Sequence, residues 1–91
     1  MTHFVYMLLC ENNKIYTGYT TDVKARFKAH LEGTKKAGAK FTNANKPIKI
    51  IYEKEFETKS EAMKEEYRIK HLARDEKLIL IQNYALEVEK N

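Results

Sequence analysis

The pattern of hydrophobic and polar residues first predicts a β-hairpin. "HFVYMLLC" (His3 to Cys10) and "IYTGYT" (Ile15 to Thr20) are rich in β-branched and aromatic residues, and Asn12-Asn13 between them suits the positive φ angles of a tight turn. A strict two-residue turn places Tyr6 and Tyr16 on opposite faces of the hairpin. A loop one residue longer, with Asn13 in a left-handed bulge, places them on the same face. The pattern alone does not choose between these registers.

A helix is expected after the hairpin, in "TTDVKARFKAHLEG". Asp22 or Thr21 caps its start, and Gly33 ends it. At about 100° per residue, Arg26 and His30 fall one turn apart along the margin of the buried face. That face is expected to carry the apolar residues that recur every four positions, Val23, Phe27 and Leu31.

The remaining chain predicts a third strand and two further helices. The strand is "IKIIYEKEF" (Ile48 to Phe56), and its apolar face is expected to carry Ile48, Ile50, Tyr52 and Phe56. Thr58 and Glu61 form a capping box that opens the second helix. Asp75 caps the third helix, after which residues 87–91 are expected to fray. The inward face of the second helix is expected to carry Ala62, Ile69 and Ala73, flanked by Met63 and Leu72.

The order of these elements is ββαβαα within a single domain, residues 1–91. Hairpin-linked strands combined with helices predict an α+β fold, a small three-stranded antiparallel sheet flanked by helices. Because a chain of 91 residues buries limited surface, any site is expected to be a shallow one.

The distribution of charge along the chain indicates a polyanionic partner. The net charge is +4, but the segment from Asp22 to Lys49 carries eight Lys or Arg against two acids, a net of +6. Residues 33–47 predict a long loop with four of these lysines. Such a segment suits a phosphate backbone, and tyrosines on the neighbouring sheet suit either base stacking or plain core packing. The residues expected to bind nucleic acid are Lys24, Lys35, Lys36, Lys40 and Lys46.

Three features bear on location. Cys10 is the only cysteine, so no intramolecular disulfide is expected. No apolar run approaches the roughly 18 residues of a membrane span, and the N-terminus lacks the pattern of a secretory leader. We therefore expect a cytoplasmic monomer with no membrane segment.

Glu66 is unusual among the charged residues. It projects about 40° from Ala62 on the second helix, within the arc that also carries Ile69. A carboxylate in that position needs a cation or hydrogen-bond donors to offset its desolvation. Two interpretations stay open here, an ion pair with an arginine across the helix–sheet interface and a metal ligand suited to Mg²⁺.

Considered in order along the chain, these residues resemble the GIY-YIG nuclease domain. Val5-Tyr6 stands for the first motif and Tyr16-Thr17-Gly18 for the second, and Arg26, His30 and Glu66 follow on the expected elements. The likeness covers about residues 3 to 82 and is greatest to short stand-alone bacterial proteins, the YhbQ/YazA-like group.

The resemblance implies an endonuclease that hydrolyses DNA phosphodiester bonds with one divalent ion, Mg²⁺ or Mn²⁺, held by Glu66. Arg26 would bind the scissile phosphate, and Tyr16, preferred over Tyr6, would position or deprotonate the attacking water. Metal-bound hydroxide and His30 stay open as the base. Branched or damaged DNA is a candidate substrate, with a protein partner as a possible source of specificity. The implied catalytic residues are Tyr6, Tyr16, Arg26, His30 and Glu66.

The resemblance also carries expectations about individual positions. A shared site needs Tyr6 and Tyr16 on one face, which favours the longer turn. Gly18 would keep the sheet surface low beside Tyr16, so that a phosphate or metal can approach. The first motif lacks its glycine and isoleucine, Tyr19 stands where some members have lysine, and Asn83 is a candidate for a late asparagine. The alternatives are a non-catalytic nucleic-acid-binding module with the same fold and a regulatory domain that acts through a protein partner.

Overall fold

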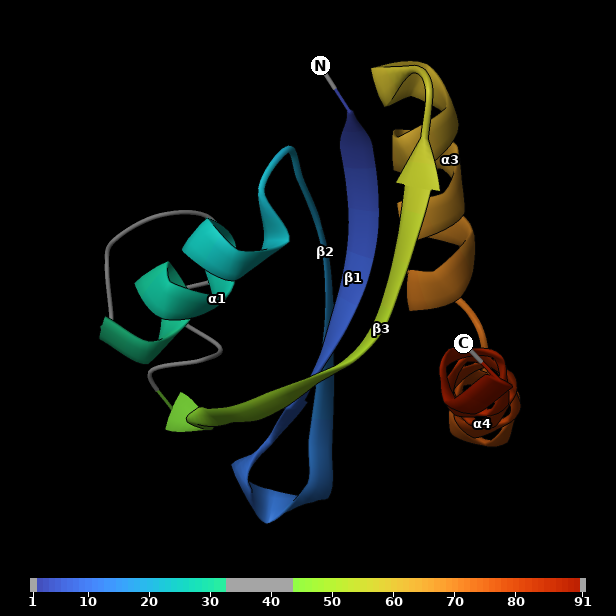
Figure 1. Cartoon of the computed structure of the whole chain (residues 1–91). Helices are drawn as coiled ribbons and strands as arrows, with labels where there is room; N and C mark the ends of the chain where they lie inside the picture. Colours follow the sequence, from blue (N-terminus) through green and yellow to red (C-terminus); the bar gives the residue numbers. More distant parts are fainter. Residues whose placement is uncertain (1, 33–43, 91) are drawn as a thin grey trace.

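The strands form one antiparallel sheet in the computed structural model, which describes residues 2–32 and 44–90. Within these residues the strands are β1 (His3–Cys10), β2 (Lys14–Thr20) and β3 (Pro47–Phe56). Their order in the sheet is β2-β1-β3, so β1 is central and β2 is an edge strand (Figure 1). The predicted hairpin and third strand are confirmed.

Three described helices cover the two faces of this sheet. They are α1 (Val23–Glu32), α3 (Lys59–Lys70) and α4 (Arg74–Lys90). α1 lies on one side of the sheet, and α3 and α4 lie on the other (Figure 1). The predicted α+β architecture is therefore confirmed. None of the helices in the described part of the chain combines the length and apolar composition needed to cross a bilayer.

The central strand β1 explains why "FVYMLLC" is apolar throughout. Its residues alternate between two cores, with Val5 and Met7 facing α3 and α4, and Tyr6, Leu8 and Cys10 facing α1. All five side chains are fully or almost fully buried. A strand covered on both faces has no polar side to present to water.

The turn of the hairpin is the longer of the two predicted forms. Cys10 pairs with Lys14 across a three-residue loop, in which Asn12 and Asn13 both have positive φ angles, 62° and 59°. Asparagine tolerates this conformation better than most residues. The resulting register places Tyr6 and Tyr16 on the same face, as the shared site required.

The prediction that Ile50 and Tyr52 share a face of β3 is wrong. Met7 pairs with Tyr52 and Leu8 with Ile50, which leaves Ile51 as an extra residue in a bulge. A second irregularity lies at Ile48, whose side chain is 57% exposed. Because a bulge reverses the alternation of side chains, Tyr52 packs in the core beneath α3 and α4 while Ile50 packs towards α1.

The start of α1 is as predicted, but its buried face is not. Asp22 caps the helix, since its Oδ1 accepts a hydrogen bond of 3.1 Å from the backbone N–H of Ala25. Leu31 is 44% exposed, whereas His30 is buried. A repeat of four residues drifts by about 40° per step on a 3.6-residue helix, so Leu31 has turned away from Val23 while His30 has not. Gly33, the predicted end of this helix, lies outside the described residues.

The cap of α3 is confirmed, and its end comes earlier than predicted. Thr58 Oγ1 accepts a hydrogen bond of 3.2 Å from the backbone N–H of Glu61. Ala62 and Ile69 are fully buried. The helix ends at Lys70, so Ala73 is exposed rather than part of the buried face.

The predicted cap and fraying of α4 are both wrong. The backbone N–H of Lys77 bonds to the carbonyl of Ala73, so the helix begins one residue before Asp75. It also continues through residues 87–90. Val88 and Ile51 line a groove between this part of the helix and β3.

Candidate active site

Gly18 is required by the ring of Tyr6. The two residues are partners across β1 and β2. A Cβ atom at Gly18 would lie 2.5 Å from the Tyr6 hydroxyl and 2.7 Å from its Cζ atom, closer than real side chains approach. The expectation that Gly18 leaves room for a phosphate or metal is therefore wrong. The space above the glycine is filled by the phenol of Tyr6.

The Tyr6 hydroxyl is joined to His30. Tyr6 Oη lies 2.9 Å from His30 Nε2, and the two side chains are only 1% and 3% exposed. Burial, with help from the Arg26 guanidinium, lowers the pKa of His30, and burial raises the pKa of Tyr6 well above its ordinary value. A neutral imidazole and a neutral phenol therefore share this bond at neutral pH. His30 is buried rather than on the margin predicted for it.

Tyr16 is the more accessible of the two motif tyrosines. It is half-buried on the edge strand β2, and its ring meets that of His30 edge-on with centroids 5.0 Å apart. Burial and the Glu66 carboxylate raise the pKa of Tyr16, while Arg26 and a hydrogen bond with Tyr6 lower it. Of the two tyrosines, Tyr16 is therefore the more exposed.

Arg26 and Glu66 bring opposite charges to these phenols from different helices. Arg26 on α1 lowers the pKa of both Tyr6 and Tyr16, and Glu66 on α3 raises both. Each charged group therefore lies within electrostatic range of the tyrosine pair. The structure thus brings together Tyr6, Tyr16, Arg26, His30 and Glu66 from β1, β2, α1 and α3.

The Glu66 side chain is 15% exposed and pairs with Lys70 of its own helix, with Oε1 and Nζ 3.6 Å apart. One interpretation of the sequence predicted an ion pair between Glu66 and an arginine across the helix–sheet interface. Among the described residues, the partner is instead a lysine of the same helix. Glu65 has almost the same exposure, 14%, but pairs with Arg68 on the other flank of α3. Lys70 was missed in the sequence, although an i, i+4 spacing from Glu66 is the usual signal of such a pair.

The residues present fit one weakly held divalent ion. Within residues 2–32 and 44–90, no group of three or more His, Cys, Asp or Glu could form a dedicated metal cage. Mg²⁺ does not need one, because it keeps several waters and commonly binds through one or two carboxylates plus substrate phosphates. Glu66 can supply one such carboxylate beside the tyrosine pair.

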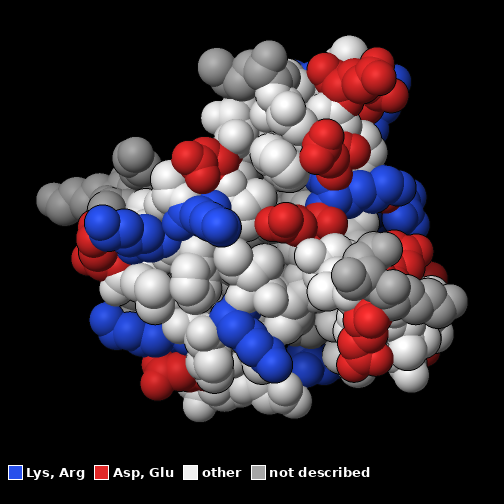
Figure 2. Space-filling model, viewed as in Figure 1, with Lys and Arg blue, Asp and Glu red and all other residues white. Residues whose placement is uncertain are grey.

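The predicted nucleic-acid-binding lysines are only partly described. Lys24 and Lys46 are exposed. Lys35, Lys36 and Lys40 lie outside the described residues. On the side of the molecule from which β3 is seen in front, Lys and Arg alternate with Asp and Glu (Figure 2). The described residues on this side do not form a single large basic patch.

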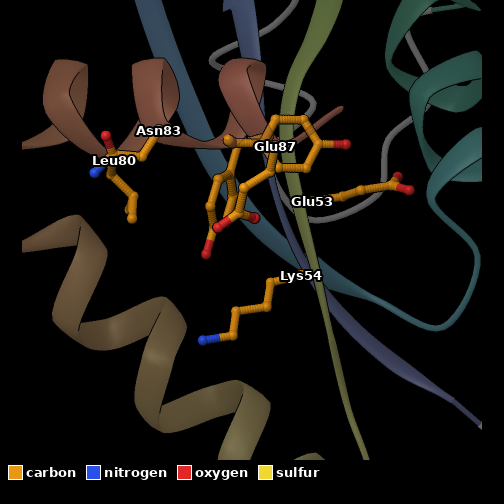
Figure 3. Close-up of a pocket in the computed structure, with 7 residues that line it drawn as sticks. Glu53, Lys54, Leu80, Asn83 and Glu87 are labelled. Atoms are coloured by element: carbon orange, nitrogen blue, oxygen red, sulfur yellow. The ribbon is translucent and has the colours of Figure 1, made fainter. Parts of the chain in front are cut away.

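A separate pocket lies between β3 and α4, on the side of the sheet away from α1. Its volume is about 240 Å³, and Lys54 and Asn83 line it. Lys54 points towards the helices and Glu53 points the opposite way (Figure 3). The pocket contains none of the five predicted catalytic residues. Asn83, the candidate late asparagine, therefore belongs to a different surface.

Comparison with known proteins gives likenesses over most of the chain. A family model described as the GIY-YIG catalytic domain matches residues 2–79. A UPF0213 protein of Staphylococcus haemolyticus (strain JCSC1435) is 45% identical over 80 residues, which cover 88% of this chain and 94% of that protein. A UPF0213 protein of Bacillus velezensis (strain DSM 23117 / BGSC 10A6 / LMG 26770 / FZB42) is 49% identical over 76 residues, 84% of this chain and 74% of that one.

Two solution NMR structures are similar in fold and sequence. A UPF0213 protein from Bacillus halodurans matches with a TM-score of 0.57 and 44% identity, covering 90% of this chain and 84% of the other. A protein from E. faecalis matches with a TM-score of 0.62 and 34% identity, covering 94% and 88%. These matches confirm the resemblance inferred from the motifs.

Proposed function

The chain belongs to the GIY-YIG family, and on this premise we propose that it is a divalent-metal-dependent endonuclease that hydrolyses DNA phosphodiester bonds. One observation carries the proposal. The Arg26 guanidinium and the Glu66 carboxylate, which come from separate helices, both lie within electrostatic range of the same pair of tyrosines. Phosphoryl chemistry needs such an arrangement, a positive group for the phosphate and an acidic group for a metal ion.

The five residues would divide the work according to their exposure. Arg26, half-buried and without an ion pair in the described part of the chain, is suited to bind the scissile phosphate. Tyr16 is suited to position the attacking water, because it is half-buried whereas Tyr6 is buried. Glu66 would hold Mg²⁺ or Mn²⁺, and the ion would stabilise negative charge on the phosphate.

Tyr6 and His30 are suited to a supporting role. Both are buried and joined to each other, so neither meets bulk solvent. The raised pKa of Tyr6 disfavours the phenolate that a general base requires. Their hydrogen-bonded pair instead supports the ring of Tyr16 through the edge-on contact with His30. A positioned ring keeps its hydroxyl in one place during reaction.

The decisive experiment compares two adjacent carboxylates of equal burial. Glu66→Ala should lower metal-dependent nicking by at least about 100-fold. Glu65→Ala, which removes the ion pair with Arg68 on the other flank of α3, should leave nicking close to wild type. Circular dichroism and DNA affinity measured in EDTA should be unchanged in both variants.

The assay should use single-stranded, duplex, flap and junction DNA, together with RNA, each with Mg²⁺, Mn²⁺ or EDTA. Among these nucleic acids, we propose branched or damaged DNA as the preferred substrate. Equal cleavage by Glu66→Ala and wild type would refute the metal-ligand assignment. Salt-sensitive DNA binding with no cleavage of any substrate would favour the non-catalytic binding module instead.

A further inference from the structure

The tyrosines of the sheet do not form an open stacking platform. Tyr6 and Tyr52 are buried, and Tyr16 and Tyr19 are half-buried. Tyr67 differs from all of them. It lies on α3 immediately after Glu66, and it is 65% exposed. A large exposed ring beside a proposed phosphodiester site needs a reason, because aromatic residues usually bury most of their surface.

The ring of Tyr67 is held in place by His71. Their ring centroids are 4.1 Å apart, with 30° between the planes. His71 is itself fixed, since its Nδ1–H donates a hydrogen bond of 2.8 Å to the backbone carbonyl of Tyr67. One side of the Tyr67 ring is thus braced while most of the side chain faces water. A braced ring loses little conformational freedom when a ligand stacks on it.

On α3, lysines lie on the same side of the helix as Tyr67, and two carboxylates lie on the opposite flank. At about 100° per residue, Lys70 and Lys64 lie roughly 60° to either side of Tyr67. Met63 lies one turn earlier and is 40% exposed. The carboxylates Glu61 and Glu65 fall on the opposite flank of the helix, towards Arg68. The exposed sector around Tyr67 therefore joins an aromatic surface to cations, and it continues directly from Glu66 and Lys70.

We propose that Tyr67, braced by His71, is a stacking site for an unpaired base of single-stranded DNA. Every base offers a π-face to an aromatic ring, and the flanking lysines match the charge of the phosphate backbone. Bases in a duplex have their faces covered by neighbouring bases, so they cannot use this ring. The site selects DNA with an unpaired strand, such as a flap, and delivers that strand towards Glu66. This inference rests on the proposed function, since it takes DNA as the substrate.

The test measures binding in EDTA, so that cleavage does not enter the result. Fluorescence anisotropy gives the Kd for a labelled oligodeoxythymidine of about 20 nucleotides and for a duplex of the same length. Tyr67→Ala should weaken binding of the single strand roughly tenfold and leave duplex binding within about twofold. Tyr67→Phe keeps the ring and should bind like wild type. A 2-aminopurine base in the oligonucleotide should lose fluorescence on binding wild type but not Tyr67→Ala.

Ile79→Ala is the matched control. Ile79 is 58% exposed on α4, so this change also removes a large exposed side chain, and it should not alter either affinity. Unchanged single-strand affinity in Tyr67→Ala, or an equal loss for duplex and single strand, would overturn the proposal. Tighter binding of an oligoribouridine than of the DNA would overturn the assignment to DNA. These outcomes are independent of the Glu66→Ala cleavage test, so either proposal can fail while the other stands.

Discussion

The two faces of the sheet use the same central strand for different purposes. On the face beneath α3 and α4, Val5 and Met7 pack with Ile69 in an apolar core. On the face beneath α1, the buried layer contains a hydrogen-bonded pair, Tyr6 and His30. Both layers exclude water, and the second contains two hydrogen-bonded polar side chains that are almost fully buried.

Tyr52 and Tyr6 are both buried, but they lie on opposite faces of the sheet and have different partners. Tyr52 faces the apolar core, where burial raises its pKa to about 12 and its ring lies 5.4 Å from that of Tyr84. Tyr6 faces α1, where its hydroxyl bonds to His30 and its ring lies over Gly18. The same residue type therefore serves packing on one face and orientation on the other. Burial alone does not distinguish these two tyrosines, whereas their polar partners do.

Among the substitutions that test this comparison, Gly18→Ala should have the largest effect on stability. The added methyl group meets the Tyr6 ring, so we expect a loss of about 1–3 kcal/mol in the free energy of unfolding. DNA cleavage should fall as well, because Tyr6 must move away from His30. Urea unfolding measures the first effect, and the nicking assay measures the second.

The neighbouring position supplies the control on the opposite face. Thr17 is buried, and its Oγ1 has no hydrogen-bond partner among the described residues. Thr17→Val keeps the shape of the side chain and should leave stability unchanged or slightly higher. If Gly18→Ala unfolded at the same urea concentration as wild type, the close approach of Tyr6 would not be the reason for the glycine.

The second largest effect should be the difference in the free energy of unfolding between Tyr6→Phe and Tyr52→Phe, each of which removes one hydroxyl from a buried tyrosine. Tyr6→Phe deletes the hydrogen bonds of the Tyr6 hydroxyl to His30 and Tyr16, and it should lower the free energy of unfolding by about 1 kcal/mol or somewhat more. Tyr52→Phe should change it by less than about 0.5 kcal/mol, since Tyr52 contributes to the apolar core through the packing of its ring, which this change keeps. Parallel urea titrations compare the two. Equal losses in the two variants would mean that the hydrogen bonds of the Tyr6 hydroxyl contribute nothing specific to stability.

The pH dependence of stability should show the smallest effect. The pKa of His30 is lowered in the folded protein by burial and by Arg26, while in the unfolded chain it returns to about 6.5. Between these values the unfolded chain binds more protons, so the free energy of unfolding falls as pH drops below about 6.5. His30→Gln should remove this part of the acid sensitivity, and His71→Gln, at an exposed position, should retain it. Thermal melts at several pH values test this, and an unchanged slope in His30→Gln would contradict it.

Local patterns were sufficient to predict much of the fold. The hairpin, the capping residues Asp22 and Thr58 and the order of elements all follow from interactions between residues a few positions apart. The five candidate site residues were also identified in the sequence, since their types and order carry the family motifs. Among these five residues, Glu66 was also indicated by its position on the inward side of its predicted helix, without reference to the family.

Pairing between distant segments decided the rest. The bulge at Ile51 arises where β3 meets β1, some forty residues earlier in the chain, so no local period could reveal it. His30 is buried because its ring packs against those of Tyr6 and Tyr16, and Gly18 is explained only by the ring of Tyr6 on the paired strand. The sequence by itself determines which turns, caps and periods can form. Which faces meet, and therefore which hydroxyl or ring is left for a ligand, depends on the tertiary packing that excludes water from one side of each element.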